Sequence, residues 1–111
     1  MVVVDALTGK VITTLPIGEG CDGAAFDPVF KRAYASNGQG TMTVVQEENG
    51  NNFKVLETVA TQPGARTITL DKTSHHIYMT TAEYESAPSE GNRRPPIKPG
   101  SFVILDIQTL K

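Results

Sequence analysis

The chain of 111 residues is 39% hydrophobic and 20% charged, and its formal net charge at pH 7 is −2. These values are typical of one globular domain with a modest core, and the weak acidic balance argues against attraction to nucleic acid or anionic lipid. No apolar run approaches the roughly 20 residues of a membrane-spanning helix, and a single cysteine excludes an intrachain disulfide.

Nine runs of about four to eight β-prone residues, each closed by a turn signal, predict strands along the whole chain. They cover residues 1–5, 11–15, 24–27, 32–36, 41–46, 53–60, 66–71, 75–81 and 101–106. Asp27 and Asp71 open two of the turns, where aspartate commonly accepts hydrogen bonds from the backbone that follows. Residues 47–52 are expected to form a polar loop, and 83–100, with four prolines, a protruding one. Because no segment keeps helical periodicity over three turns, the sequence predicts an all-β protein.

The chain repeats itself, since residues 10–37 align with residues 54–81 after a shift of 44 positions and without a gap. Positions identical in the two copies are Lys10 with Lys54, Val11 with Val55, Thr14 with Thr58, Gly20 with Gly64, Asp27 with Asp71 and Tyr34 with Tyr78. A period of this length that contains four short strands is typical of one blade of a β-propeller.

The order of the strands predicts a β-propeller fragment with two four-stranded antiparallel blades and one surplus N-terminal strand. Residues 1–5 would be the outer strand of a preceding blade, 10–46 one blade, and 53–106 a second blade that carries the Pro-rich insertion 83–100. Two blades cannot close a ring, so further blades are expected from the same parent chain or from other copies.

Three stretches carry a resemblance to a known family. Asp-Ala-Leu-Thr-Gly-Lys-Val at 5–11, Gly-Ala-Ala-Phe-Asp-Pro at 23–28 and Arg-Ala-Tyr-Ala-Ser-Asn-Gly at 32–38 resemble the repeat of YVTN/YncE-type β-propellers. In that family, the first stretch is a strand-turn-strand that links consecutive blades. The Tyr-Val-Thr-Asn signature is altered here, to Tyr-Ala-Ser-Asn at 34–37 and Tyr-Met-Thr-Thr at 78–81.

The resemblance implies a bacterial, periplasmic or secreted protein that serves as a binding scaffold for a small molecule or a protein. The N-terminal residues, Met-Val-Val-Val-Asp, have none of the features of a signal peptide. The family resemblance is specific for fold, since the matched residues belong to turns and core.

Asp22 and Arg66 are the candidate ligand-binding residues, because they occupy equivalent positions in the two copies and differ in charge. Asp22 precedes the predicted strand 24–27 and Arg66 begins the predicted strand 66–71, and both should lie close to the axis of a propeller. The two side chains could pair with each other, or they could form a polar rim that orients an anionic or polar ligand.

The search for other chemistry finds no catalytic motif, no cofactor-binding motif and no metal site. His75 and His76 are adjacent, so on a strand they would point to opposite faces and could not chelate one metal. Arg93-Arg94 with Lys98 makes a small basic spot that we interpret as part of a mixed-charge loop. We expect the single cysteine, Cys21, to be a small buried side chain.

Three functions are compatible with the sequence. The preferred one is a non-catalytic propeller segment that binds a ligand or partner. The alternative is part of a propeller enzyme, such as a lactonase-like hydrolase or a quinoprotein-type dehydrogenase, with its site at the ring axis. Binding of single-stranded nucleic acid is the third, and the acidic balance weighs against it.

Overall fold

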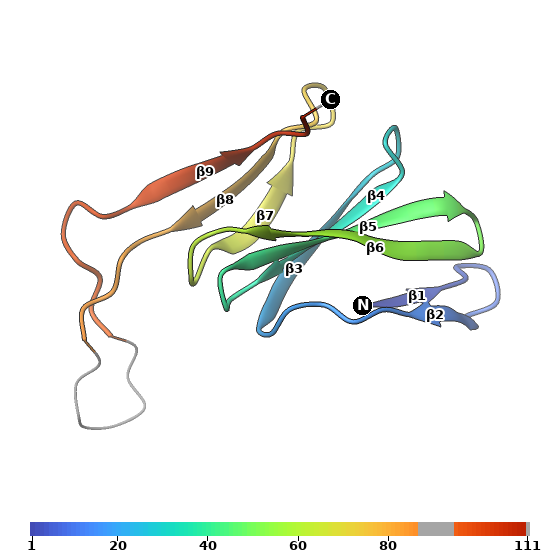
Figure 1. Ribbon diagram of the computed structural model, residues 1–111, viewed down its shortest axis with the longest axis horizontal. Coiled ribbons are helices and arrows are strands. Elements are labelled where there is room, and N and C mark those ends of the chain that lie inside the picture. The colour runs from blue at the N-terminus through green and yellow to red at the C-terminus, as the bar shows by residue number, and fades with distance from the viewer. Residues whose placement is uncertain (87–94, 111) are drawn as a thin grey trace.

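The computed structural model describes residues 1–86 and 95–110, and these residues confirm an all-β fold (Figure 1). Every strand predicted from the sequence is present, with small differences at its ends. In chain order the strands are β1 (Val2–Val4), β2 (Val11–Thr14), β3 (Cys21–Asp27), β4 (Arg32–Asn37), β5 (Thr41–Asn49), β6 (Asn52–Ala60), β7 (Arg66–Leu70), β8 (Ile77–Thr81) and β9 (Val103–Ile107).

The strands form three antiparallel sheets, with the orders β1-β2, β3-β4-β5-β6 and β7-β8-β9. The sequence predicted one sheet over residues 10–46, a second over residues 53–106, and a surplus strand at 1–5. The boundaries between these predicted sheets are wrong by one strand. β2 pairs with β1 and not with β3, and β6 pairs with β5 and not with β7. Over the described residues, the sheets do not close into a ring.

Local turn chemistry explains this pairing. The carboxylate of Asp5 accepts hydrogen bonds from the amides of Leu7 and Thr8, and the amide of Gly9 bonds to the carbonyl of Asp5. These bonds close a tight turn, so the Asp-Ala-Leu-Thr-Gly-Lys stretch joins two strands of one sheet and does not link consecutive sheets. The expected loop 47–52 is likewise shorter than predicted, because β5 continues to Asn49 and β6 begins at Asn52.

The β1–β2 and β5–β6 pairs share the same irregularity. One residue of β2 is left out of the pairing between the partners of Val3 and Val4. In the same way, one residue of β6 is left out between the partners of Val44 and Val45. The 44-residue repeat also aligns β2 with β6. The N-terminal hairpin of β1 and β2 therefore repeats the pair of β5 and β6 in the four-stranded sheet.

The core lies between the four-stranded and the three-stranded sheet, where β3 and β4 contact β7. Ile77 and Met79 point to this side of β8, because alternate residues of a strand face the same side. The buried hydrophobic cluster is made of Tyr34, Met42, Val44, Ala65, Ile77 and Met79.

The molecule is more open than a compact domain of its size. Its radius of gyration is 16.0 Å, against about 13 Å expected for a compact chain of this length. Its accessible surface is 7351 Å², against about 6000 Å² for a compact monomer of this mass. Much apolar surface therefore stays in contact with solvent at both ends of the chain.

Two smaller expectations are corrected by the structure. Cys21 is exposed and not buried, because it begins β3 at the open edge of the sheet. His75 lies in the turn before β8 with a φ of 63°, so the strand starts at Ile77.

Among the described residues, no helix is long and apolar enough to cross a membrane.

Candidate functional site

The first strands of two neighbouring sheets approach each other closely at Gly23. A Cβ at this position of β3 would lie 3.1 Å from Cγ2 of Ile68 and 3.3 Å from Cβ of Thr67 in β7. This contact brings Asp22 and Arg66 together, with 3.8 Å between Oδ2 of the carboxylate and Nε of the guanidinium. The expectation that the two opposite charges could pair is confirmed.

This ion pair leaves both groups accessible. The side chains of Arg66 and Asp22 are 41% and 38% exposed, and exposed pairs contribute about 0–1 kcal/mol. A guanidinium has five N–H donors, and Asp22 is the one acidic partner recorded for Arg66 within the described part of the chain. The site could therefore accept an anionic or polar group without losing a strong internal contact.

A second contact between the same two sheets joins Asp27, at the end of β3, to His75. Asp27 is 1% exposed, and its Oδ2 lies 2.6 Å from Nδ1 of His75. Its Oδ1 accepts hydrogen bonds from the amides of Val29 and Phe30, which confirms the predicted turn. Burial works to raise the pKa of Asp27, but the hydrogen bonds from His75 and the two amides outweigh it, so the pKa lies below its usual range.

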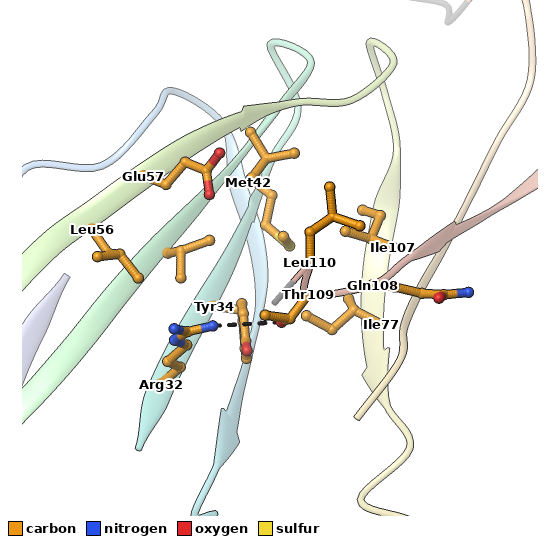
Figure 2. Close-up of a pocket in the computed structure, with 12 residues that line it drawn as sticks. Arg32, Tyr34, Met42, Leu56, Glu57, Ile77, Ile107, Gln108, Thr109 and Leu110 are labelled. Carbon is orange, nitrogen blue, oxygen red and sulfur yellow. Dashed lines mark hydrogen bonds between the residues drawn. The ribbon is translucent and has the colours of Figure 1, made fainter. Parts of the chain in front are cut away.

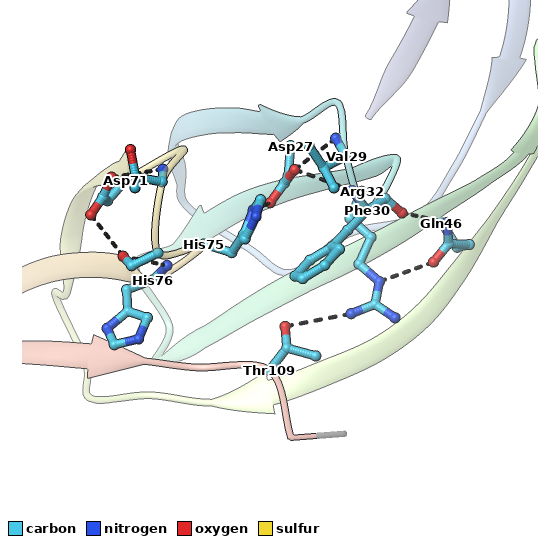
Figure 3. Close-up of polar contacts among 11 residues, drawn as sticks. Asp27, Val29, Phe30, Arg32, Gln46, Asp71, His75, His76 and Thr109 are labelled. Atoms are coloured by element: carbon cyan, nitrogen blue, oxygen red, sulfur yellow. Dashed lines mark hydrogen bonds and ion pairs between the residues drawn. The ribbon is translucent and has the colours of Figure 1, made fainter.

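A polar network continues from this contact to the end of β9 (Figure 3). The ring of Phe30 packs on the imidazole of His75 with 4.3 Å between centroids, and the guanidinium of Arg32 lies 5.7 Å from the centroid of Phe30. Arg32 donates to Oε1 of Gln46 at 2.9 Å and to the hydroxyl of Thr109 at 3.5 Å. The contacts of Phe30 with His75 and of Arg32 with Thr109 join the two sheets, and we interpret the network as structural.

The other predicted residues of this region also have structural partners. Nδ1 of His76 lies 3.0 Å from the carboxylate of Asp106. The carboxylate of Asp71 accepts hydrogen bonds from the hydroxyl of Ser74 and the amide of Thr73, and these bonds lower its pKa. The two adjacent histidines have different carboxylate partners, Asp27 for His75 and Asp106 for His76.

A cavity of about 370 Å³ opens between the two sheets (Figure 2). Its walls are mostly apolar, with Arg32, Glu57 and Thr109 among the polar lining residues. The hydroxyl of Tyr34 is buried and has no hydrogen-bond partner among the described protein groups. Burial raises the pKa of Tyr34, although the nearby Arg32 works to lower it, so the hydroxyl stays protonated at neutral pH.

The remaining predictions concern metals and the Pro-rich loop. Within residues 1–86 and 95–110, no group of three His, Cys, Asp or Glu side chains could hold a metal ion. The ammonium of Lys98 lies 3.8 Å from the carboxylate of Glu83, as expected for a mixed-charge loop. Arg93 and Arg94, the rest of the basic spot, lie outside the described residues.

The sequence indicated that Asp22 could pair with Arg66, which the structure shows, but it gave no sign of the contact of Asp27 with His75 or of the cavity beside Tyr34. Both missed features join residues from different sheets, and no local pattern in the sequence marks them. Comparison with known proteins identifies no relative, since no family model, no curated protein and no solved structure matches this chain.

Proposed function

We propose that this protein is a non-catalytic binding scaffold of the β-propeller type, with a polar or anionic ligand held at Asp22 and Arg66. The observation that carries the proposal is the weak, exposed ion pair between equivalent positions of two adjacent sheets. A pair that served stability alone would gain little at this exposure, whereas a ligand could replace one partner at small cost.

The path of the chain supports the propeller architecture. Four strands, β3 to β6, follow one another as a meander, and the chain then returns from Ala60 to Arg66 at the start of the next meander. There β7 lies against β3, the first strand of the preceding sheet. A ring of such sheets requires more blades than this chain supplies, either from a longer parent chain or from other copies.

The resemblance to YVTN/YncE-type proteins extends the proposal to location. Proteins of this type would act outside the cytoplasm of a bacterium, in the periplasm or as secreted proteins. Cell fractionation with antibodies against this chain is the direct measurement, and a purely cytoplasmic signal would contradict this part of the proposal.

The binding site can be tested by titrating isotope-labelled protein with sodium phosphate or with succinate at constant ionic strength. Amide resonances around Asp22 and Arg66 should shift in a saturable way. Arg66→Gln should abolish the shifts, whereas Asp22→Asn should strengthen binding because it frees the guanidinium. Lys54→Gln is the matched control, since Lys54 also forms an exposed pair, with 2.7 Å to Glu48, but lies on β6.

Two results would contradict the proposal. The first is an equal response of Arg66→Gln and the wild type, which would show that the anions bind elsewhere or only screen charge. The second is a bound metal ion or a visible absorbance band in the purified protein, which would favour the alternative of a propeller enzyme.

A further inference from the structure

The cavity between the four-stranded and the three-stranded sheet has an apolar body and one polar end (Figure 2). Its volume of about 370 Å³ lies within the roughly 300–1,000 Å³ that is usual for small-molecule sites. Most of the lining is apolar and comes from both sheets, with Met42, Val44, Leu56, Val59, Ile77 and Ile107. A space of this size and lining suits a short hydrocarbon chain.

The polar end of the cavity contains a hydroxyl without a partner. Tyr34 is 2% exposed, and its hydroxyl makes no hydrogen bond to any described protein group. Arg32 and Thr109 are neighbours of this hydroxyl, but neither has the geometry of a hydrogen bond with it. Buried polar groups almost always have a partner, so this hydroxyl needs one from outside the protein chain.

Arg32 adds a positive charge to the same end. Among the described residues its guanidinium has no acidic partner, and it donates only to the neutral groups of Gln46 and Thr109. The contact with Thr109, at 3.5 Å, is longer than a usual hydrogen bond, and the segment 108–110 that provides it is exposed. The polar end therefore offers donors and a positive charge, and a carboxylate can accept from both groups at once.

Two acidic residues of this region leave the polar end free for an anion. Glu57 also lines the cavity, but it lies on the far side from Arg32 and Thr109 (Figure 2). The charge of Asp27 acts on Tyr34 as well, but the Asp27 carboxylate already accepts from His75 and from two backbone amides.

We propose that this cavity binds a small carboxylic acid with an apolar chain, of the size of octanoate. The carboxylate accepts from the guanidinium of Arg32 and the hydroxyl of Tyr34 and replaces Thr109 as the partner of Arg32. The hydrocarbon chain lies along the apolar walls of both sheets. Asp22 and Arg66 do not line this cavity, so the proposal does not depend on the function proposed above.

Titration of the isotope-labelled full chain with sodium octanoate, below the concentration at which octanoate forms micelles, tests the proposal. The amide resonances of Tyr34, Val44 and Ile77 should shift in a saturable way. Sodium acetate has the same head group without the chain, and octylamine hydrochloride has the same chain with the opposite charge. At equal concentration and ionic strength, both should leave these resonances in place.

Tyr34→Phe is the decisive variant, because it removes the hydroxyl and keeps the ring. Tyr34→Phe and Arg32→Gln should each weaken octanoate binding by about tenfold or more, the usual value of a hydrogen bond to a charged group. The thermal midpoint of Tyr34→Phe should not fall, since the hydroxyl has no protein partner to lose. Thr109→Ala should bind at least as tightly as the wild type, because it removes the competing contact. Arg66→Gln is the control, and it should bind octanoate normally.

Three results would overturn the proposal. The first is a set of octanoate shifts that spreads over exposed apolar residues such as Ile104 and spares the cavity. The second is an equal response to octylamine or acetate. The third is a Tyr34→Phe variant with the affinity of the wild type, which is expected if the hydroxyl holds only water. If Arg32→Gln loses its β-sheet circular dichroism, Arg32→Lys takes its place and should also bind more weakly, because lysine lacks the planar fork.

Discussion

The carboxylate of Asp27 and the imidazole of His75 lie 2.6 Å apart, although 48 residues separate them in the sequence. Because an ionised carboxylate only accepts hydrogen bonds, Nδ1 of His75 is the donor. Each residue belongs to the turn of a different sheet, so this hydrogen bond joins the four-stranded sheet to the three-stranded one. Asp27 is almost fully enclosed, whereas the His75 side chain is partly exposed.

Replacing Asp27 with Asn should destabilise the protein by about 1.5–3 kcal/mol, because a buried charged acceptor loses its charge while its donor stays in place. The measurement is the free energy of unfolding from urea denaturation. Asp71→Asn is the matched control, since Asp71 holds the equivalent turn position but is exposed. It should cause a much smaller loss, and equal losses would show that Asp27 acts only as a turn residue.

The stability should depend on pH through Asp27. Its pKa in the folded protein lies below the ordinary value, which is about 3.9. The native state therefore binds fewer protons than the unfolded state in this range, and stability rises with pH. The contribution is complete above the ordinary pKa and is lost as the pH falls through the lowered one.

Urea denaturation of the wild type and Asp27→Asn at a series of acidic pH values measures this dependence. The stability curves of the two proteins should converge at the acid end and separate toward neutral pH. The pKa of Asp71 is also lowered, but this effect is common to both proteins and cancels in the difference. Curves that stay parallel over the whole range would contradict the role assigned to Asp27.

Gly18→Ala should destabilise the protein by about 1–3 kcal/mol through overpacking. A Cβ at this position would lie 2.6 Å from Nδ2 of Asn37 and 2.7 Å from Oγ1 of Thr41. Asn37 cannot easily move away, because it is buried and donates to Thr41 and Thr43. Gly50→Ala is the control, since a Cβ there meets nothing within 4 Å, and its thermal midpoint should stay near that of the wild type.

The pair of Asp22 and Arg66 should contribute less than about 1 kcal/mol to stability. A double-mutant cycle with Asp22→Ala and Arg66→Ala measures the coupling energy, which should shrink further at high salt. A coupling of several kcal/mol that resists salt would indicate a structural ion pair and would weaken the proposed ligand site. The same cycle on Glu48 and Lys54 provides an internal reference for an exposed pair.

The sequence determined the strands and most of their turns. Alternation of apolar residues and the placement of Asp, Gly and Pro are local features, so they located every strand to within a few residues. They also predicted that Asp27 and Asp71 would accept hydrogen bonds from the turns that follow. The sequence further indicated that Asp22 and Arg66 could pair, which the structure shows. This last expectation came from the repeat, because equivalent positions of adjacent units lie near each other in a repeat protein.

Only the tertiary structure decided which strands pair. The segments on either side of β2 are equally long, at 5–10 and 15–20, so length alone did not show whether β2 pairs with β1 or with β3. The hydrogen bonds to the Asp5 carboxylate close the first segment into a hairpin, and the second crosses to the next sheet. The contact of Asp27 with His75 is equally absent from any local pattern, because strand pairing and sheet packing depend on residues that meet only after the chain has folded.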